Sequence, residues 1–217
     1  MKKTVFLIMN LVLAVLIMCP LSISAQELKP IRLLNPQLNI GRPLMQVLND
    51  RRSMREFSSE KLSIQVLSNL LWAAWGINRR ERGLRTAPSA ANFQEIDIYV
   101  AMEEGLYLYD ADTHMLEPII AKDIRAETGT QSFVKDAPMN LVYVADYSRM
   151  RGTREGNEVL SAVHTGYISQ NVYLFCASEG LATVVRGLVD KPTLKKVMNL
   201  RPDQHVTFGQ SVGYPKK

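Results

Sequence analysis

The residues best suited to bind an anion are Arg51, Arg52 and Arg55, which lie with Ser53 in the segment 51–57 (Arg-Arg-Ser-Met-Arg-Glu-Phe). A guanidinium group can donate two parallel hydrogen bonds to a phosphate, which a lysine cannot do. The cluster follows the expected end of a short helix, where the helix dipole repels anions. The side-chain charges themselves would therefore have to hold a phosphate. An exposed basic loop is the alternative, and this segment alone does not exclude it.

Two other segments could contact a planar ligand. The loop 85–94 is built mainly of small residues and includes Ser89 and Asn92, which offer hydrogen-bond donors and acceptors just before an expected strand. Farther along the chain, Val185-Arg186-Gly187 ends another expected strand. A glycine there lets backbone N–H groups approach a ligand without a side chain in the way. Each segment, taken alone, is also a common structural feature.

The sequence lacks the motifs of several common kinds of active site. It contains no G-x-G-x-x-G or G-x-x-x-x-G-K-[ST] loop for phosphates, no H-E-x-x-H zinc motif and no C-x-x-C pair. His114, His164 and His205 stand alone and are typical of structural or solvated histidines, and Cys176 is typical of a core residue. We therefore expect no catalytic side chain and no metal site. The chemistry would come from a bound cofactor.

The elements that must position these segments form an irregular mixture of helices and strands. Helical spacing predicts helices at 44–50, at 63–75 with Ser63 as cap and Gly76 as left-handed stop, and at 158–179 before Gly180. Alternating or continuous apolar residues predict strands at 96–103, 106–109, 140–145, 181–185 and 206–212, with a turn at 104–105 and the last strand closing the sheet. Because the two types do not alternate regularly, the pattern favours an α+β fold over a doubly wound one.

The first 25 residues have the order of a secretory signal peptide. Lys2 and Lys3 precede an apolar run from Thr4 to Cys19, which is shorter than the roughly 20 residues that span a bilayer. Small residues then lead to Ala25, which predicts cleavage at that point. An uncleaved anchor and a lipoprotein attached through Cys19 are the alternatives. We expect an exported, periplasmic protein without membrane contact after cleavage, with an extended lead-in at 26–43 and one domain at 44–217.

Length and composition agree with a single globular domain. The chain has 217 residues, of which 47% are hydrophobic and 22% charged, so a disordered chain is excluded. Its formal net charge of +5 is modest and is not gathered in one tail, which gives no case for nucleic acid as a partner. Once residues 1–25 are removed, Cys176 is the one cysteine left, so no intrachain disulfide can form.

Taken together and in this order, the segments resemble the nitroreductase family of flavoproteins. The resemblance is carried by six stretches, at 51–57, 70–76, 87–90, 168–174, 179–183 and 212–215. The loop Ala87-Pro88-Ser89-Ala90, followed by the segment 105–110, is most similar to the branch that includes azoline-oxidising dehydrogenases of peptide-modifying clusters.

The resemblance implies a homodimer of α+β subunits, each with a central, mainly antiparallel sheet flanked by helices, and FMN bound at the subunit interface. The helix at 158–179 would pack in that interface. Its apolar residues Ile168, Val172, Phe175 and Cys176 agree with such packing.

The resemblance also assigns the cofactor contacts. It assigns the phosphate and ribityl chain to Arg51, Arg52 and Ser53, with Arg55 as an addition, and the isoalloxazine ring to Ser89 and Asn92. It places the backbone N–H groups of 185–187 near flavin N5.

The implied reaction is hydride transfer through flavin N5 to a nitroaromatic, a quinone or a related small molecule, with NAD(P)H as a potential electron donor. If the protein is exported, NAD(P)H would not be expected to reach it, because reduced nicotinamides belong to the cytosol. The alternative is a flavin-binding or structural relative without turnover.

Two departures from the family pattern bear on these expectations. Arg186 stands where several members carry an acidic residue. Its positive charge is expected to favour the anionic reduced flavin and to raise the midpoint potential. The chain ends at Lys216-Lys217, whereas many members continue with further basic phosphate contacts and a tail around the partner subunit. Phosphate affinity and dimer stability are therefore both open on the sequence alone.

Overall fold

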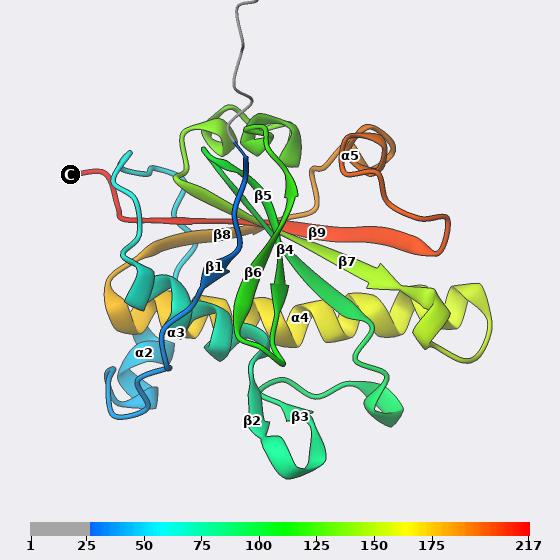
Figure 1. The fold of residues 1–217 in the computed structure, drawn as a ribbon. Helices are drawn as coiled ribbons and strands as arrows, with labels where there is room; N and C mark the ends of the chain where they lie inside the picture. The colour runs from blue at the N-terminus through cyan, green and yellow to red at the C-terminus, as the bar shows by residue number, and fades with distance from the viewer. Residues whose placement is uncertain (1–26) are drawn as a thin grey trace, which may run out of the picture.

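The computed structural model describes residues 27–217 (Figure 1). The predicted signal peptide at 1–25 lies outside the described residues. Within 27–217, no helix combines the length and the apolar character that crossing a membrane requires.

A seven-stranded sheet forms the centre of the molecule, in the order β1-β6-β5-β4-β7-β9-β8, and all its pairings are antiparallel. The strands are β1 (Ile31–Arg32), β4 (Ile96–Met102), β5 (Gly105–Asp110), β6 (Met115–Ile120), β7 (Met139–Asp146), β8 (Ala182–Arg186) and β9 (Gln204–Gly213). All eight residues of β7 are buried, as their nearly continuous apolar sequence predicts. The expected α+β fold with a central antiparallel sheet is confirmed.

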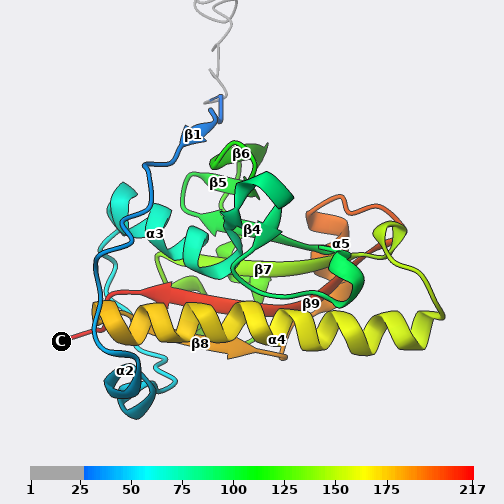
Figure 2. The same ribbon diagram turned by 90° about the horizontal axis from the view of Figure 1, so that it is seen from below.

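Within the described range 27–217, four α-helices flank this sheet: α2 (Leu44–Asp50), α3 (Ile64–Trp75), α4 (Arg154–Glu179) and α5 (Lys191–Val197). Figure 2 shows α4 lying along one face of the sheet. On that face, Leu70 and Leu71 of α3 and Ile168 of α4 share a core with inward residues of β4 and β7. Leu194 of α5 packs in a second core on the other face. The alternation along β4 and β7 therefore supplies both cores.

The three helices expected from the sequence are present, with differences at their ends. Ser63 caps α3 as predicted, accepting the Val66 N–H at 3.3 Å. Gly76 is not a left-handed stop, because its φ is −69°; a Cβ atom there would instead overlap the Trp72 ring. The long helix begins at Arg154 rather than at 158, since Thr153 caps it by accepting the Gly156 N–H at 3.1 Å.

Several elements differ from the sequence-based expectations. β6, α5 and a short hairpin of β2 (Ile77–Arg79) and β3 (Leu84–Arg85) were not predicted. β9 does not close the sheet, because it lies between β7 and β8, and β8 forms the edge. The turn after β4 is at 103–104, and Gly105 already begins β5 with a φ of +153°. A side chain at this glycine would overlap the backbone of β6.

Candidate functional site

The segment 51–54 leaves the end of α2 and follows the outer edge of β8. The Met54 N–H donates to the Thr183 carbonyl at 2.9 Å, which fixes the segment against this edge. Arg51 and Arg52 line a cavity of about 670 Å³, which we call the arginine cavity. The structure thus presents two of the predicted phosphate-binding residues to one space.

A third cation reaches the arginine cavity from the C-terminus. Phe57 forms an isolated bridge with Pro215, and the Lys216 N–H donates to the Glu56 carbonyl at 3.3 Å. Lys216 lines the arginine cavity and also a larger neighbouring cavity. Sequence alone left open whether Lys216 could contribute here.

One acidic side chain also lines the arginine cavity. This is Asp50, which is paired with Arg42, and the hydrogen bond from Arg42 lowers the pKa of that carboxyl group. Since Arg42 balances Asp50, the charges of Arg51, Arg52 and Lys216 remain for an anion. This donor set fits a phosphate dianion.

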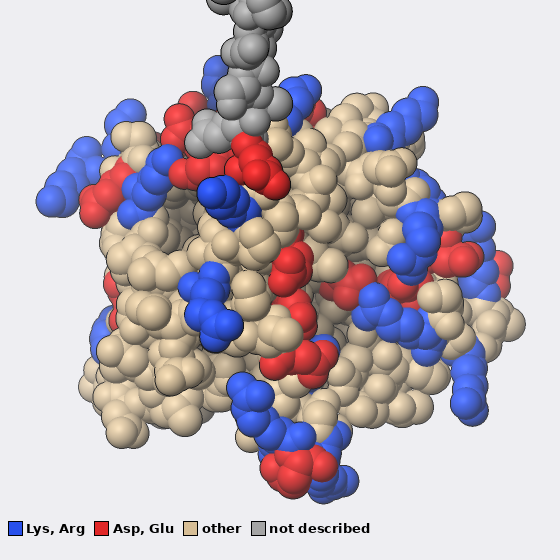
Figure 3. Space-filling model, viewed as in Figure 1, with Lys and Arg blue, Asp and Glu red and all other residues tan. Residues whose placement is uncertain are grey.

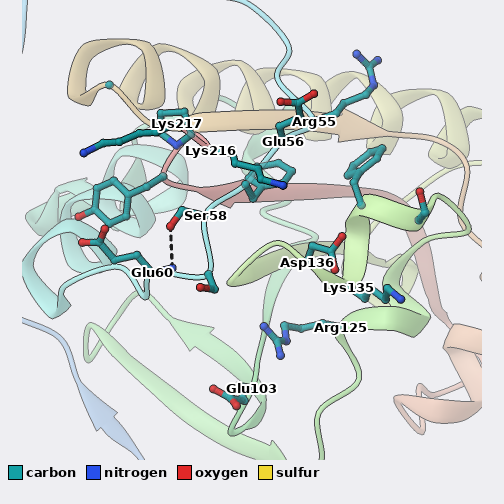
Figure 4. A pocket seen from close by; sticks show the side chains of 17 residues that line it. Arg55, Glu56, Ser58, Glu60, Glu103, Arg125, Lys135, Asp136, Lys216 and Lys217 are labelled. Carbon is teal, nitrogen blue, oxygen red and sulfur yellow. Dashed lines mark hydrogen bonds between the residues drawn. The ribbon is translucent and has the colours of Figure 1, made fainter.

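Arg55 lies on a different cavity. Residues 55–60 all line a second, larger space of about 1400 Å³, so the chain passes from one cavity to the other between Met54 and Arg55. In Figure 4, Arg55 lies beside Glu56, and Arg125 lies between Asp136 and Glu103. The structure therefore does not place Arg55 beside Arg51 and Arg52, and the signs of charge in this second cavity are mixed.

Tyr173 of α4 connects the first and third predicted segments. Its hydroxyl lies 2.8 Å from Ser53 Oγ and accepts the Val185 N–H at 3.0 Å. The Arg51 guanidinium lies 5.2 Å from the centre of the Tyr173 ring. Sequence reasoning gave Tyr173 no role, because it lies on a helix whose spacing predicts core packing.

Removing the Tyr173 hydroxyl should leave the Val185 N–H without its acceptor. For Tyr173→Phe we expect a loss of about 1–2 kcal/mol in the free energy of unfolding, measured by urea denaturation. Tyr214→Phe is the control and should change it by less than about 0.5 kcal/mol, because Tyr214 is half-buried and its hydroxyl has no hydrogen-bond partner within residues 27–217. Equal losses in the two variants would contradict the bridging role.

The segment 185–187 at the end of β8 has backbone groups along the outer edge of the sheet and a side chain, that of Arg186, packed into the protein. β8 is an edge strand, and Thr183 and Val185 use their outward backbone groups for Met54 and Tyr173. Gly187 directly follows β8 and is exposed, and its N–H is the next backbone donor along this edge. This N–H has no partner in the part of the chain that the structure describes. Of the three predicted residues, Gly187 is therefore the one with a backbone donor left for a ligand.

Arg186 points to the other face of β8 and is 3% exposed. Its guanidinium donates to the Thr128 carbonyl at 2.8 Å and to Asn140 Oδ1 at 3.0 Å, while Nε has no hydrogen-bond partner among the described residues. Gly129 and Gly209 make room for it, since a Cβ atom on either would crowd the guanidinium. Burial lowers the pKa of Arg186 to about 10, so the group stays charged at neutral pH. No carboxylate within 27–217 pairs with it.

The loop 89–94 is held by hydrogen bonds that leave particular donors free. Ser89 Oγ accepts the Gln94 N–H at 3.1 Å, and Asn92 Oδ1 accepts from Gln94 Nε2 at 2.9 Å. The Ser89 hydroxyl proton and the Asn92 amide protons remain available. Such donors suit the carbonyl oxygens and ring nitrogens of a planar ligand. The Ala90 N–H donates to His164 Nε2 at 2.9 Å, which attaches the loop to α4.

Within the chain, this loop and the arginine cavity are separated. His164 holds the loop and Tyr173 borders the cavity, and nine residues along a helix correspond to about 13 Å. The structure therefore brings the first and third predicted segments together, while the second lies farther along α4.

The exposed face of α4 differs from the one expected for a dimer interface. Ile168, Val172 and Cys176 are buried in the core of the chain and Phe175 is half-buried, so the residues expected in the interface belong mainly to the core. The exposed apolar residues are instead Val159, Val163 and Tyr167, with exposed fractions of 64%, 42% and 47%. Their spacing of four residues places them on one stripe. Leu44, Met45 and Leu48 of the neighbouring α2 are exposed as well.

Two other features of the described residues can be set aside as sites. Residues 209–213 match the pattern G-x-S-x-G, which went unrecognised in the sequence, but Ser211 is fully buried within β9 and donates to Asn140 Oδ1 at 2.6 Å. It is therefore not on an exposed nucleophile turn. On the face shown in Figure 3, basic and acidic side chains are interspersed, including those on the β2–β3 hairpin at the bottom.

Comparisons with known proteins agree on one family. A family model described as "Nitroreductase family" matches residues 48–214. The curated "Putative nitroreductase MJ1384" of Methanocaldococcus jannaschii is 34% identical over 170 residues, which cover 73% of this chain and 85% of that protein.

Solved structures show the same likeness. A crystal structure of a "putative nitroreductase" from Ralstonia eutropha JMP134 is 42% identical and covers 88% of this chain and 91% of its own, with a TM-score of 0.84. A "putative nitroreductase in complex with fmn" from Desulfovibrio desulfuricans shares the fold at 22% identity, with a TM-score of 0.60, covering 81% of this chain and 88% of its own.

Proposed function

The chain belongs to the nitroreductase family, and we propose that it is an exported FMN-dependent oxidoreductase that reduces a small acceptor such as a nitroaromatic or a quinone. The observation that carries the cofactor assignment is the arginine cavity, in which Arg51, Arg52 and Lys216 leave three cationic side chains for a phosphate. FMN is also present in the Desulfovibrio structure of the same fold. Export rests on the sequence of residues 1–25.

The residues of this chain would hold the cofactor at three points. Arg51, Arg52 and Lys216 would bind the phosphate, and the Gly187 N–H would be available to the flavin ring. Ser89 and Asn92 would donate hydrogen bonds to the ring's acceptor atoms. FMN, when bound, supplies the hydride chemistry, so the protein's part is to orient donor and acceptor and to set the flavin potential. Such a mechanism does not require a catalytic side chain.

We propose that the complete site forms in a homodimer. The loop 89–94 and the arginine cavity lie about 13 Å apart along α4 in one subunit, on either side of Ile168. If two α4 helices cross antiparallel near this point, a two-fold axis brings the loop of the partner subunit to the arginine cavity of this one. The exposed stripe of Val159, Val163 and Tyr167 supplies an apolar surface for such a contact.

Turnover is the test of the proposed reaction. The protein loaded with FMN should lose its flavin absorbance on addition of NAD(P)H or dithionite and regain it with a nitroaromatic or a quinone. Reduction by dithionite without reoxidation by any such acceptor would support the flavin-binding alternative instead. The narrower likeness to azoline-oxidising dehydrogenases is a separate prediction. In the same assay, an azoline-containing peptide should reduce the bound flavin in place of NAD(P)H.

The buried charge of Arg186 should raise the flavin potential. For an assumed separation of roughly 10 Å and an effective dielectric constant of about 20, one unit charge contributes ~1.7 kcal/mol, which corresponds to a shift on the order of 30–70 mV. We expect Arg186→Gln to lower the midpoint potential by this amount in a potentiometric titration. Glutamine is preferable to glutamate, because both present partners of Arg186 are acceptors. Arg125→Gln removes a positive charge elsewhere and serves as the control. An Arg186→Gln potential that is unchanged, or changed no more than that of the control, would contradict this role.

A further inference from the structure

We propose that the buried pair of Glu95 and His164 is the positioning device for the loop 89–94, which it holds in a strained shape suited to ligand binding. The inference rests on the proposed function, because Ser89 and Asn92 of this loop are assigned to the flavin ring. Neither Glu95 nor His164 touches the proposed ligand; both would act through the backbone of the loop.

The loop has a backbone that its residues do not favour. Ala91, Asn92 and Gln94 have φ values of +47°, +55° and +48°. Residues other than glycine rarely adopt this left-handed region. Asparagine tolerates it because its short polar side chain can form local hydrogen bonds, whereas an alanine has no polar side chain that could compensate. Three such residues within four positions need an external restraint if the loop is to keep one conformation.

His164 supplies that restraint through a defined protonation state. Its Nε2 accepts the Ala90 N–H at 2.9 Å, so this nitrogen carries no proton. The proton therefore lies on Nδ1, which donates to Glu95 Oε1 at 2.7 Å. Glu95 thus selects the tautomer of His164 that can hold Ala90.

The pair is attached to rigid parts of the fold. His164 lies in the middle of α4, and the Glu95 carbonyl accepts the Asp146 N–H at 2.9 Å, directly before β4. The His164 and Glu95 side chains are 4% and 0% exposed. The loop is therefore held between the long helix and the central strands, as a preorganised site requires.

The composition of the pair also indicates a role beyond packing. Glu95 Oε2 is buried and has no partner among residues 27–217. A buried carboxylate with an unsatisfied oxygen is unfavourable, and apolar residues of similar volume would fill this space at lower cost. A glycine at position 91 would likewise relieve the strain. The fold instead combines a costly pair with a strained loop, and the hydrogen bond to Ala90 joins the two.

Two substitutions each remove one of the two hydrogen bonds of His164 and can keep the other. In His164→Asn, the amide nitrogen can take the place of Nδ1 and keep Glu95, while the acceptor for Ala90 is lost. In His164→Gln, the amide oxygen can take the place of Nε2 and keep Ala90, while the bond to Glu95 is lost. Hydrogen exchange of residues 89–94 in the full chain without added cofactor measures the order of the loop. Titrations with FMN and with riboflavin measure binding.

We expect His164→Asn to speed exchange at Ala90 at least tenfold and to weaken FMN and riboflavin by a similar factor, so that the preference for FMN is unchanged. His164→Gln should remain within about threefold of the wild type in both measurements. Ala91→Gly added to His164→Asn should recover part of the lost affinity, because glycine adopts the left-handed region without strain.

The proposal is overturned if His164→Asn leaves the exchange of the loop unchanged. It is also overturned if the two variants lose flavin affinity equally and only in proportion to their loss of global stability. Should the wild type bind no flavin, the proposed function fails, whereas the exchange data still decide whether His164 holds the loop.

Discussion

Replacing Arg51 and Arg52 together with glutamine should weaken FMN binding by at least about 100-fold, while the affinity for riboflavin changes less than about fivefold. Each charge-assisted hydrogen bond to a phosphate contributes about 1.5–3 kcal/mol, and two such losses combine. Riboflavin lacks the phosphate, so its affinity does not depend on these two hydrogen-bond donors. Quenching of flavin fluorescence on titration with protein measures both affinities.

A matched control removes the same charge elsewhere. Arg80 and Arg82 are exposed on the turn of the β2–β3 hairpin, so Arg80→Gln with Arg82→Gln lowers the net charge equally without reaching the arginine cavity. This variant should bind FMN within about twofold of the wild type. Equal losses for FMN and riboflavin in the Arg51/Arg52 variant would show that the arginines support the fold rather than the phosphate.

Placing glutamates on the exposed stripe of α4 should convert a dimer into monomers. Val159→Glu with Val163→Glu would bury four carboxylates per dimer in an apolar contact, which raises the dissociation constant at least about 100-fold. Sedimentation velocity over a range of concentrations measures this change. Because the site is proposed to be shared between subunits, FMN affinity should fall together with dimerisation.

Ile119 provides the control for this second prediction. It is an exposed apolar residue on β6 with an exposed fraction of 43%, similar to that of Val163, but it lies away from α4. Ile119→Glu should leave both the oligomeric state and the FMN affinity unchanged. A wild-type protein that stays monomeric at every concentration, yet binds FMN fully, would contradict the shared site.

The sequence predicted the elements with strong local signals. Ser63 and Gly180, together with the 3.6-residue spacing, located α3 and the end of α4. β6 was missed because Glu117 and Pro118 interrupt its apolar pattern, which a strand near the edge of the sheet tolerates. The order of the last two strands was wrong, because periodicity identifies a strand but not its neighbours.

The candidate site was predictable only where its residues are adjacent in the chain. Arg51, Arg52 and Ser53 form a dense local cluster, and the strand-end glycine is also a local signal. Glu95 and His164 are 69 positions apart, so their pairing could not be read from a sequence in which each histidine stands alone. Tyr173 was missed for a related reason, since its hydroxyl contacts Ser53 across 120 positions while its spacing on α4 is that of a core residue.

The most direct measurement is the mass of any small molecule that denaturation releases from the purified protein, followed by titration of the emptied protein with FMN. The account predicts FMN itself, rebinding at one molecule per subunit with micromolar or better affinity. A colourless protein that takes up no FMN at micromolar concentration, with its arginine cavity intact, would contradict it.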